Sequence, residues 1–378
     1  MSEPLGSPDI FVVGGGPAGL AAAILAAEHG FGVAVADLAR PPIDKACGEG
    51  LMPDTVAALD GLGVRFDRRE CVAFRGIRFR DASGGISVEA RFLQGWGTGV
   101  RRTILHSRLV QRATELGVRL LWGARVKIDG SGQVFCSGMP VRSRWIIGAD
   151  GENSQIGRWV DPHRPRYEHI RFAYRQHFRA SPWTDFVEVY WGRNCQIVVA
   201  PVGSDEICVA LTSRSPNTRL GEALAGVPEL ARRLACAPPT SRGTGARTAL
   251  RRLRTVHRGP FALIGDASGS VDPLTGEGLG LAFKQASALV QALERQDLRL
   301  YQAAHDRIGR VTRLTSRLML LMDAHPRVGK RALRALAGEP ALFSRILNTQ
   351  VDALSPAEFG VWNALRLGWR LLRPGWQA

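Results

Sequence analysis

The sequence contains few lysines and no run of basic residues. Lysine occurs only at positions 45, 127, 284 and 330, so arginine supplies most of the formal net charge of +16 and is spread along the 378 residues. Nucleic-acid sites need clustered lysine and arginine, usually with interleaved aromatic side chains. The scattered charge therefore predicts no nucleic-acid partner, and we infer no obligate protein partner.

Paired cysteines and long apolar runs are also missing. The six cysteines show neither a CxxC pair nor zinc-ligand spacing, which predicts reduced thiols and no metal site. The N-terminus lacks a basic, signal-like segment, and the most apolar stretch, residues 20–36, is interrupted by Glu28, His29 and Gly30. These absences predict a cytoplasmic protein.

The bulk composition is that of a packed globular protein, with 45% hydrophobic and 22% charged residues. A chain of 378 residues exceeds one average domain, so we expect two closely joined lobes.

The N-terminal residues 10–37 have the pattern of a dinucleotide-binding unit. Residues 10–13 are an apolar run typical of a buried parallel strand, and a glycine-rich turn follows at 14–19. An alanine-rich helix leads to a second strand at 33–36, which ends in Asp37. The strand, turn, helix and acidic end together predict an ADP-containing cofactor.

Each of three glycines in this turn has a mechanical reason for its position in a pyrophosphate-binding unit. Gly14 permits the tight turn, Gly16 lets the backbone approach the phosphates, and Gly19 allows the helix to pack closely on the strand. The free N–H groups of the helix N-terminus attract the phosphates, and Asp37 can accept ribose hydroxyls. The cofactor-binding residues predicted from this unit are Gly14, Gly16, Pro17, Ala18, Gly19 and Asp37.

Two further motifs lie downstream. The segment WIIGADGENS spans residues 145–154 and contains an Ala-Asp-Gly turn. In the segment 261–286 an apolar strand leads to Asp266, then to a loop rich in glycine, serine and proline, and then to a glycine-rich helix start at 276–280. This second strand-to-helix junction predicts a second anion site far from the first along the chain.

The three ordered motifs resemble the FAD-binding pattern of the glutathione-reductase-like flavoproteins. The resemblance is to the branch that contains p-hydroxybenzoate hydroxylase, geranylgeranyl reductases and flavin-dependent halogenases, and it covers roughly residues 8–300. It implies FAD as the cofactor, with Asp266 on the ribityl chain and the backbone amides of 276–279 at the pyrimidine edge of the flavin. Arg102, in the stretch RRTILHSRL, matches an arginine that family members place on FAD. The further cofactor-binding residues implied are Val126, Asp150, Gly265, Pro273, Gly276, Gly278 and Leu279, together with Cys47 and Gly48.

The fold class that follows is α/β: a Rossmann-like FAD-binding fold with an inserted, mainly antiparallel β substrate domain and a helical C-terminal region. We expect residues 1–165 and 245–300 to form the discontinuous FAD-binding domain, with part of 70–100 joining the substrate sheet. Residues 166–244 would be the substrate-binding β-sheet domain, and 301–378 the helical region. The segments between 165 and 215 read as strands separated by glycine, proline, asparagine and aspartate.

The stretch KACGEGLMP at 45–53 resembles a Cys-Gly segment that lies beside the flavin in geranylgeranyl-reductase-like members. Cys47 and Glu49 are therefore candidate catalytic residues, as a proton donor or as a tuner of the flavin potential. The alternative is that Cys47 is a small residue filling a tight contact.

Three activities share this scaffold. A monooxygenase hydroxylates an activated carbon of an aromatic or polyketide-like molecule, and a prenyl reductase adds hydride to a C=C bond of an isoprenoid or lipid. A halogenase needs a lysine near a Trp-x-Trp-x-Ile-Pro segment, and neither is present. We favour the monooxygenase, with the reductase as the alternative; a non-catalytic lipid carrier is an alternative of another class.

The reductant and substrate follow from the same reasoning. No second nicotinamide fingerprint occurs, so NADPH or NADH would bind only transiently. The expected substrate is a small apolar or aromatic molecule, contacted by Tyr190, Trp191 and Gln196 of the inserted sheet.

The C-terminal region contains two apolar helical patterns. Between residues 307 and 325 the apolar positions Ile308, Val311, Leu314, Leu318 and Leu321 share one helical face, which we expect to dock on the core. In the last 20 residues Val361, Trp362, Leu365, Trp369 and Leu372 share another face, with arginines elsewhere. This second pattern predicts either packing on the protein or peripheral contact with an anionic membrane.

Overall fold

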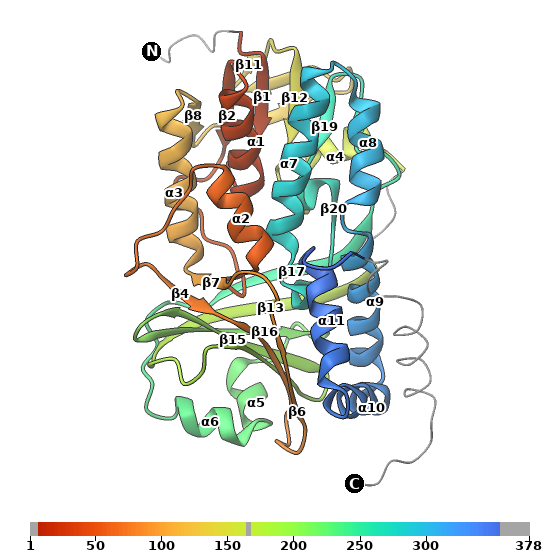
Figure 1. Ribbon diagram of the computed structural model, residues 1–378. Coiled ribbons are helices and arrows are strands. Elements are labelled where there is room, and N and C mark those ends of the chain that lie inside the picture. The colour runs from red at the N-terminus through yellow and green to blue at the C-terminus, as the bar shows by residue number, and fades with distance from the viewer. Residues whose placement is uncertain (1–6, 164–167, 356–378) are drawn as a thin grey trace.

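The structure is a computed structural model that describes residues 7–163 and 168–355. Its upper half in Figure 1 is a layered α/β unit, its lower half is built on a large β-sheet, and three helices cover one side of that sheet. The α/β fold class is confirmed. The predicted C-terminal helix with Val361 and Trp362 lies outside the described residues.

A six-stranded sheet forms the centre of the upper half. Its strands are, in order, β18 (His257–Arg258), β19 (Phe261–Leu263), β12 (Trp145–Gly148), β1 (Ile10–Val13), β2 (Val33–Asp37) and β8 (Arg119–Trp122). All neighbours pair in parallel except β18 with β19. Parallel strands are covered on both faces, which explains the continuous apolar sequence of β1 and β2.

Helices and a small antiparallel sheet surround these strands. The elements are α1 (Pro17–Glu28), α2 (Pro53–Gly61), α3 (Arg102–Glu115), α4 (Gln155–Val160), α7 (Gly278–Glu294), α8 (Leu298–Arg307), and the strands β9 (Val126–Ile128), β10 (Val134–Cys136) and β11 (Met139–Pro140). Helix α1 packs against both α3 and α7, which is why its alanine-rich sequence is buried nearly all round.

An eight-stranded sheet forms the lower half. Its order is β20 (Gly269–Ser270), β17 (Thr244–Arg252), β13 (Glu168–Arg179), β16 (Glu206–Ser213), β15 (Cys195–Gly203), β14 (Val187–Trp191), β5 (Gly76–Asp81) and β6 (Ser87–Arg91). Only β14 and β5 pair in parallel. A three-stranded sheet, β3 (Gly50–Leu51), β7 (Gly97–Val100) and β4 (Cys71–Phe74), lies where the halves meet.

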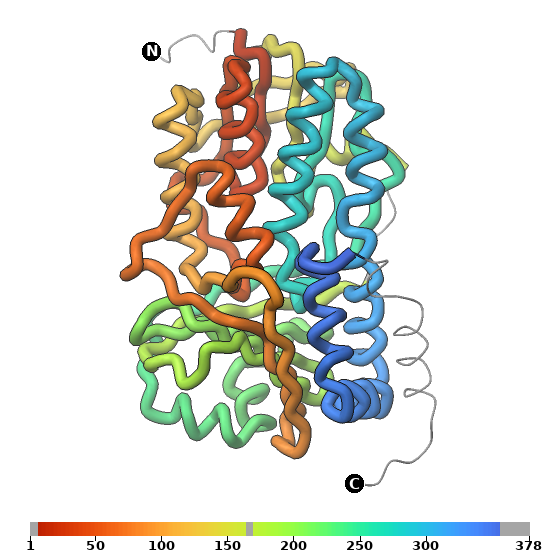
Figure 2. The backbone as a smooth tube through the Cα atoms, viewed as in Figure 1, coloured from red at the N-terminus to blue at the C-terminus, as the bar shows by residue number. Residues whose placement is uncertain are grey.

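The chain passes between the halves repeatedly, as the tube in Figure 2 shows. Residues 76–91 lie in the lower sheet, as the sequence predicts for part of 70–100. Residues 244–252 form β17 of that sheet. The boundary expected from the sequence instead assigns residues from 245 onward to the FAD-binding domain. The domain boundaries as a whole remain a proposal.

Five helices flank the large sheet. On one face lie α5 (Leu220–Ala225) and α6 (Pro228–Leu234), and on the other α9 (Arg310–Ala324), α10 (Pro326–Ala337) and α11 (Pro340–Gln350). Two short 3-10 helices, η1 (Gly265–Ser268) and η2 (Pro273–Thr275), connect β19 to α7. Within the described residues, no helix has the length and apolar character needed to cross a bilayer.

The predicted core face of α9 is wrong. Leu314, Leu318 and Leu321 are 60%, 41% and 47% exposed. The helix instead buries a partly polar face, in which Ser316 accepts a hydrogen bond from the backbone of Asp272. The buried face combines polar Thr312, Ser316 and Asp323 with apolar Met319 and Leu320, while Leu314, Leu318 and Leu321 face outward.

Candidate active site

A cavity of about 760 Å³ extends from the carboxyl end of β1 to the space between the large sheet and the helices α9–α11. Every predicted cofactor-binding residue except Gly19 lines it. Gly19 lies under the turn, where an added Cβ would come within 2.0 Å of the carbonyl oxygen of Gly14. Its position is that of a packing residue between helix and strand.

The glycine turn after β1 leaves open space on the cavity side. Gly14 has φ +111°, and a Cβ there would lie 2.3 Å from the carbonyl oxygen of Ala149. A Cβ at Gly16 would meet nothing within 4 Å. Asp37 accepts hydrogen bonds of 2.7 Å from the backbone N–H groups of Gly15 and Ala39, so its carboxylate is held at the cavity edge. This arrangement has room for a pyrophosphate at the N-terminus of α1.

A residue that the sequence reasoning missed, His106, supports the turn. Its Nδ1 lies 3.3 Å from the backbone nitrogen of Ile43 and its Nε2 lies 2.9 Å from the carbonyl oxygen of Gly15. Because Nδ1 accepts a hydrogen bond from Ile43, Nε2 carries the hydrogen and donates a hydrogen bond to the carbonyl oxygen of Gly15. Burial lowers the pKa of His106, which keeps this tautomer neutral.

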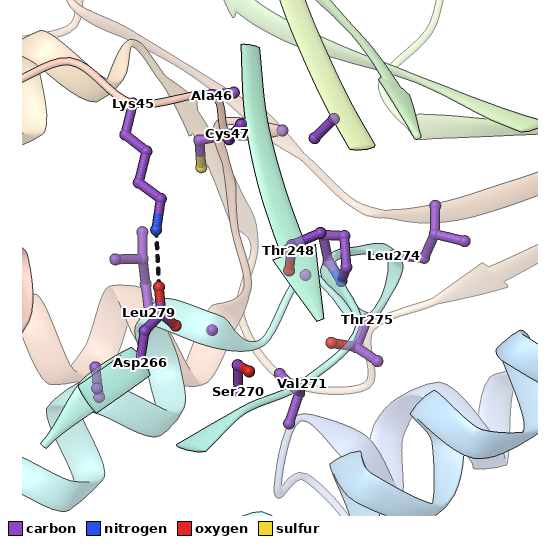
Figure 3. Close-up of a pocket in the computed structure, with 18 of the residues that line it drawn as sticks. Lys45, Ala46, Cys47, Thr248, Asp266, Ser270, Val271, Leu274, Thr275 and Leu279 are labelled. Carbon is purple, nitrogen blue, oxygen red and sulfur yellow. Dashed lines mark hydrogen bonds and ion pairs between the residues drawn. The ribbon is translucent and has the colours of Figure 1, made fainter. Parts of the chain in front are cut away.

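The second anion site faces the same cavity. Lys45 donates a 2.8 Å hydrogen bond to Asp266 at the start of η1, and this pair lies beside Cys47, Ser270 and Leu279 (Figure 3). Burial acts to raise the pKa of Asp266, but Lys45 and neighbouring arginines outweigh it and hold the pKa below its usual value. The carboxylate is therefore ionised and available to accept hydroxyl groups.

Positive and unpartnered groups complete this half of the cavity. The Nε atom of Arg102 is buried, lines the cavity wall and has no hydrogen-bond partner. Gly276 has φ +69° and ends η2 just before the N-terminus of α7, whose first N–H groups are free. Two helix N-termini, an orphaned arginine donor and two placed carboxylates fit FAD, which when bound would supply the hydride and electron chemistry.

Asp150 and Val126 line the same cavity. Asp150 accepts hydrogen bonds from the side chain of Ser154 and from the backbone nitrogen of Gln155, and burial raises its pKa. The side chain of Gln155 donates to the carbonyl oxygen of Val126 at 2.8 Å. The Ala-Asp-Gly turn thus fixes the wall of the cavity through hydrogen bonds.

The Cys47–Glu49 segment forms the part of the wall between the two halves. Glu49 is buried and adopts φ +58°, and its backbone nitrogen lies 3.4 Å from the Sγ of Cys47. Its Oε1 accepts a 2.9 Å hydrogen bond from the backbone of Arg102, and its Oε2 lies 2.5 Å from the Nε2 of His177. Both predicted catalytic candidates therefore lie at the cavity, and Glu49 has a partner that the sequence reasoning missed.

The missed partners come from strand β13. Arg171, Arg175 and His177 are all at most 1% exposed and lie on one face of this strand, at alternate positions. Arg175 pairs with Asp44, and burial, which acts to lower its pKa, is outweighed by Asp44 and Glu49. A signal was present, since Arg171, Arg175 and His177 share one face of a strand, with Ala173 between the arginines, and such polar residues on one face indicate a site.

Glu49, His177 and Cys208 place ligand-type atoms within 4.8 Å of one another. A metal ion there would face the guanidinium groups of Arg101 and Arg175, which lie 3.1 and 3.2 Å from the Nδ1 of His177. Burial raises the pKa of Cys208 well above its usual value, so the sulfur remains a neutral thiol. The surrounding charge suits a hydrogen-bond network and not a cation.

The predicted substrate contacts lie elsewhere. Tyr190 faces the opposite side of the sheet, where its hydroxyl donates to Glu188 at 2.8 Å and burial raises its pKa. Trp191 packs edge-on against Phe79, with ring centroids 5.7 Å apart. Gln196 bonds Arg171 and, at 2.7 Å, Asp323. The period-two alternation of β14 directs Val187 and Val189 into the cavity in place of Tyr190.

The part of the cavity between the large sheet and the helices α9–α11 is apolar, and we call it the apolar lobe. Its walls come from the large sheet and from the C-terminal helices; they include Val187, Val189, Val198, Met319, Met322, Phe343 and Leu347. Leu318 and Leu321 line it and are also exposed, so the lobe reaches the surface along α9.

Comparison with known proteins agrees with this geometry. The family model for an FAD binding domain matches residues 8–297. A menaquinone reductase of Mycobacterium tuberculosis is 31% identical over 354 residues, covering 84% of each chain, and digeranylgeranylglycerophospholipid reductase 1 of Methanopyrus kandleri is 30% identical, covering 76% of this chain and 82% of its own. Among solved structures, 2-methyl-3-hydroxypyridine-5-carboxylic acid oxygenase superposes with a TM-score of 0.72 at 22% identity, covering 92% of this chain and 96% of its own, which shows the shared fold. The chain therefore belongs to the FAD-binding domain family and is an FAD-dependent oxidoreductase.

Proposed function

We propose that this flavoenzyme is a monooxygenase, driven by NADPH or NADH, that hydroxylates an aromatic or polyketide-like small molecule. The observation that supports this most directly is the continuity of the cavity. One space joins the FAD cradle to the apolar lobe, where valine, leucine, methionine and phenylalanine side chains form the walls. Oxygen transfer needs such a water-poor site, because water diverts reactive intermediates.

The shape of the lobe favours a substrate with an apolar extension. Valines of β14 and β15 face methionines and Phe343 of the helices, so a chain or ring system can be buried on both sides. The polar groups at the inner end, Arg175 and Glu49, can orient a hydroxyl or carbonyl beside the flavin. An alkylated or prenylated ring meets both requirements.

The entrance along α9 also fits an apolar substrate. Leu318 and Leu321 are half exposed and line the lobe, while arginines occupy neighbouring positions of the same helix. We propose that the substrate enters over these leucines. Peripheral contact with a lipid surface through the last 20 residues remains a proposal, because they lie outside the described residues.

A second candidate is reduction of a C=C bond in an isoprenoid or lipid. The relatives named menaquinone reductase and digeranylgeranylglycerophospholipid reductase 1 support it, as does the position of Cys47 and Gly48 at the cavity. The same apolar lobe would hold a prenyl chain.

An isotope experiment separates the two reactions. The FAD-loaded protein is reduced anaerobically with NADPH or NADH and mixed with isotopically labelled dioxygen and a panel of alkylated phenols and prenylated quinones. We expect a product that has gained one labelled oxygen atom. A product that has gained two hydrogen atoms and no label would overturn the monooxygenase proposal in favour of the reductase.

A further inference from the structure

Three side chains connect the cavity wall to the protein surface. Glu49 lines the cavity, His177 lies behind it with 1% exposure, and Ser241 follows at a half-buried position of the loop before β17. The His177 Nε2 is 2.5 Å from the Oε2 of Glu49, and the His177 Nδ1 is 2.7 Å from the Oγ of Ser241. The hydrogen-bonded path is continuous from cavity to surface.

The surroundings of His177 determine where its proton lies. Besides Ser241, the Nδ1 atom faces Nη2 of Arg101 at 3.1 Å and Nη1 of Arg175 at 3.2 Å. Guanidinium groups only donate, so Nδ1 is an acceptor and Nε2 carries the hydrogen. The Nε2–H group is therefore aligned with Glu49 for proton transfer.

Each arginine beside the imidazole of His177 has a carboxylate partner of its own. Arg175 contacts Asp44, and the Nε of Arg101 lies 3.6 Å from Glu206. Cys208, on β16, contributes a neutral thiol. Neither arginine is free to neutralise Glu49 completely; the closest guanidinium atom of Arg175 is 3.9 Å from its Oε1. Transfer of the Nε2 proton to Glu49 therefore keeps the imidazole neutral only when Nδ1 gains a proton in the same step.

Both candidate reactions consume one proton at the buried site. In hydroxylation, NAD(P)H, a proton, dioxygen and substrate give NAD(P)⁺, water and the hydroxylated product. In reduction, NAD(P)H and a proton saturate one C=C bond. The nicotinamide supplies the hydride in each case, so the proton must come from solvent.

We propose that Ser241, His177 and Glu49 form the proton relay that supplies it. The hydroxyl proton of Ser241 moves to Nδ1 of His177 as Ser241 takes a proton from water. In the same step the Nε2 proton moves to Oε2 of Glu49, and Glu49 gives up one proton at the cavity, so one proton enters, one leaves and the imidazole ends as the neutral Nδ1–H tautomer. This inference rests on flavin-dependent oxidoreduction but is independent of the choice between the two reactions.

Solvent exchange of the His177 ring proton tests the relay directly. In FAD-loaded protein labelled with ¹⁵N-histidine, we expect NMR to show His177 as the Nε2–H tautomer. We expect Ser241→Ala to slow exchange of that proton with solvent by about tenfold or more, because the hydroxyl that links it to water is gone. Ser215→Ala, which removes an exposed hydroxyl in another loop of the same sheet region, should leave the exchange rate unchanged. Equal exchange rates in all three proteins, or an Nδ1–H tautomer, would overturn the relay.

Kinetics of the loaded enzyme provide a second, separable measurement. His177→Gln can still donate to Glu49 but cannot pass a proton on. We expect it to retain FAD, to accept hydride from NAD(P)H anaerobically at the wild-type rate, and to lose about 10²-fold in the overall turnover, with partial rescue by added imidazole. Wild-type turnover with an unchanged pH profile would contradict the relay. Failure to find any oxygenated product would concern only the proposed reaction, because the exchange measurement needs no substrate.

Discussion

The cofactor half of the cavity and the apolar lobe, which is the proposed substrate half, are constructed differently. In the cofactor half, short contiguous segments provide backbone N–H groups and carboxylates at helix N-termini, as in the turns at 14–19 and 265–279. In the substrate half, single side chains from β14, β15, α9 and α11 meet across the apolar lobe. The first half is specified locally and the second by tertiary packing.

The contrast explains where function can vary. A dinucleotide has a fixed shape, so the turns that bind it need particular backbone conformations at particular glycines. An apolar lobe needs only complementary volume, and many combinations of valine, methionine and phenylalanine provide that. The four predictions below perturb one half at a time.

The largest effect is expected at the glycine turn. Gly14→Ala should abolish FAD binding and lower the free energy of unfolding, because its Cβ would lie 2.3 Å from the Ala149 carbonyl oxygen. Gly30→Ala is the control: it has φ +83° but open space around the Cβ, so it should cost only about 1–2 kcal/mol and retain FAD. Flavin content and chemical denaturation measure both outcomes. Equal effects of the two variants would mean that backbone conformation, and not the close approach, matters at Gly14.

Asp266→Ala should weaken FAD binding by about 1.5–3 kcal/mol, because it removes a charged hydrogen-bond acceptor from the cavity. Asp205→Ala, at an exposed turn outside the cavity, should have no effect on affinity. Titration of apoprotein with FAD, followed by flavin fluorescence, gives both dissociation constants. An unchanged affinity for Asp266→Ala would remove this carboxylate from the cofactor half.

Leu318→Glu should raise the KM for an apolar substrate by about tenfold, since a charge would lie in the wall of the apolar lobe. Leu314→Glu is matched to it, because Leu314 lies on the same exposed side of α9 but does not line the cavity. Steady-state kinetics should show no change for the control. Similar KM values for both variants would place the entrance elsewhere.

The smallest effect on function is expected at Tyr190. Tyr190→Phe should leave the KM for substrate unchanged, because this hydroxyl bonds Glu188 on the far face of the sheet. The free energy of unfolding should fall by about 1 kcal/mol through loss of that hydrogen bond. A clear rise in KM without a loss of stability would restore Tyr190 to the substrate half.

The difference between local motifs and tertiary packing also determines which parts of the site can be predicted from the sequence. The glycine turns, Asp37 and Asp266 are readable because each motif and its neighbours in space are also neighbours in the chain. Glu49 and His177 are 128 positions apart, so their contact depends on how β13 lies in the large sheet. The leucine face of α9 misleads because periodicity identifies an apolar stripe without saying whether core, cavity or solvent lies beside it. The position of Tyr190 was hard to predict because alternate residues of a strand face opposite sides of the sheet, and a shift of one residue reverses the face.

The large sheet has a consequence for how the protein is made. Its strands come from residues 76–91, 168–213, 244–252 and 269–270, and its covering helices extend to Gln350. The pairings of β5 with β14 and of β13 with β17 join segments distant along the chain, a feature associated with slow folding. Because the last strand ends at Ser270, we expect the sheet to be complete only after residue 270 has left the ribosome, and its covering helices only after Gln350. We therefore expect nascent chains to expose unpaired strands during synthesis and to depend on chaperones.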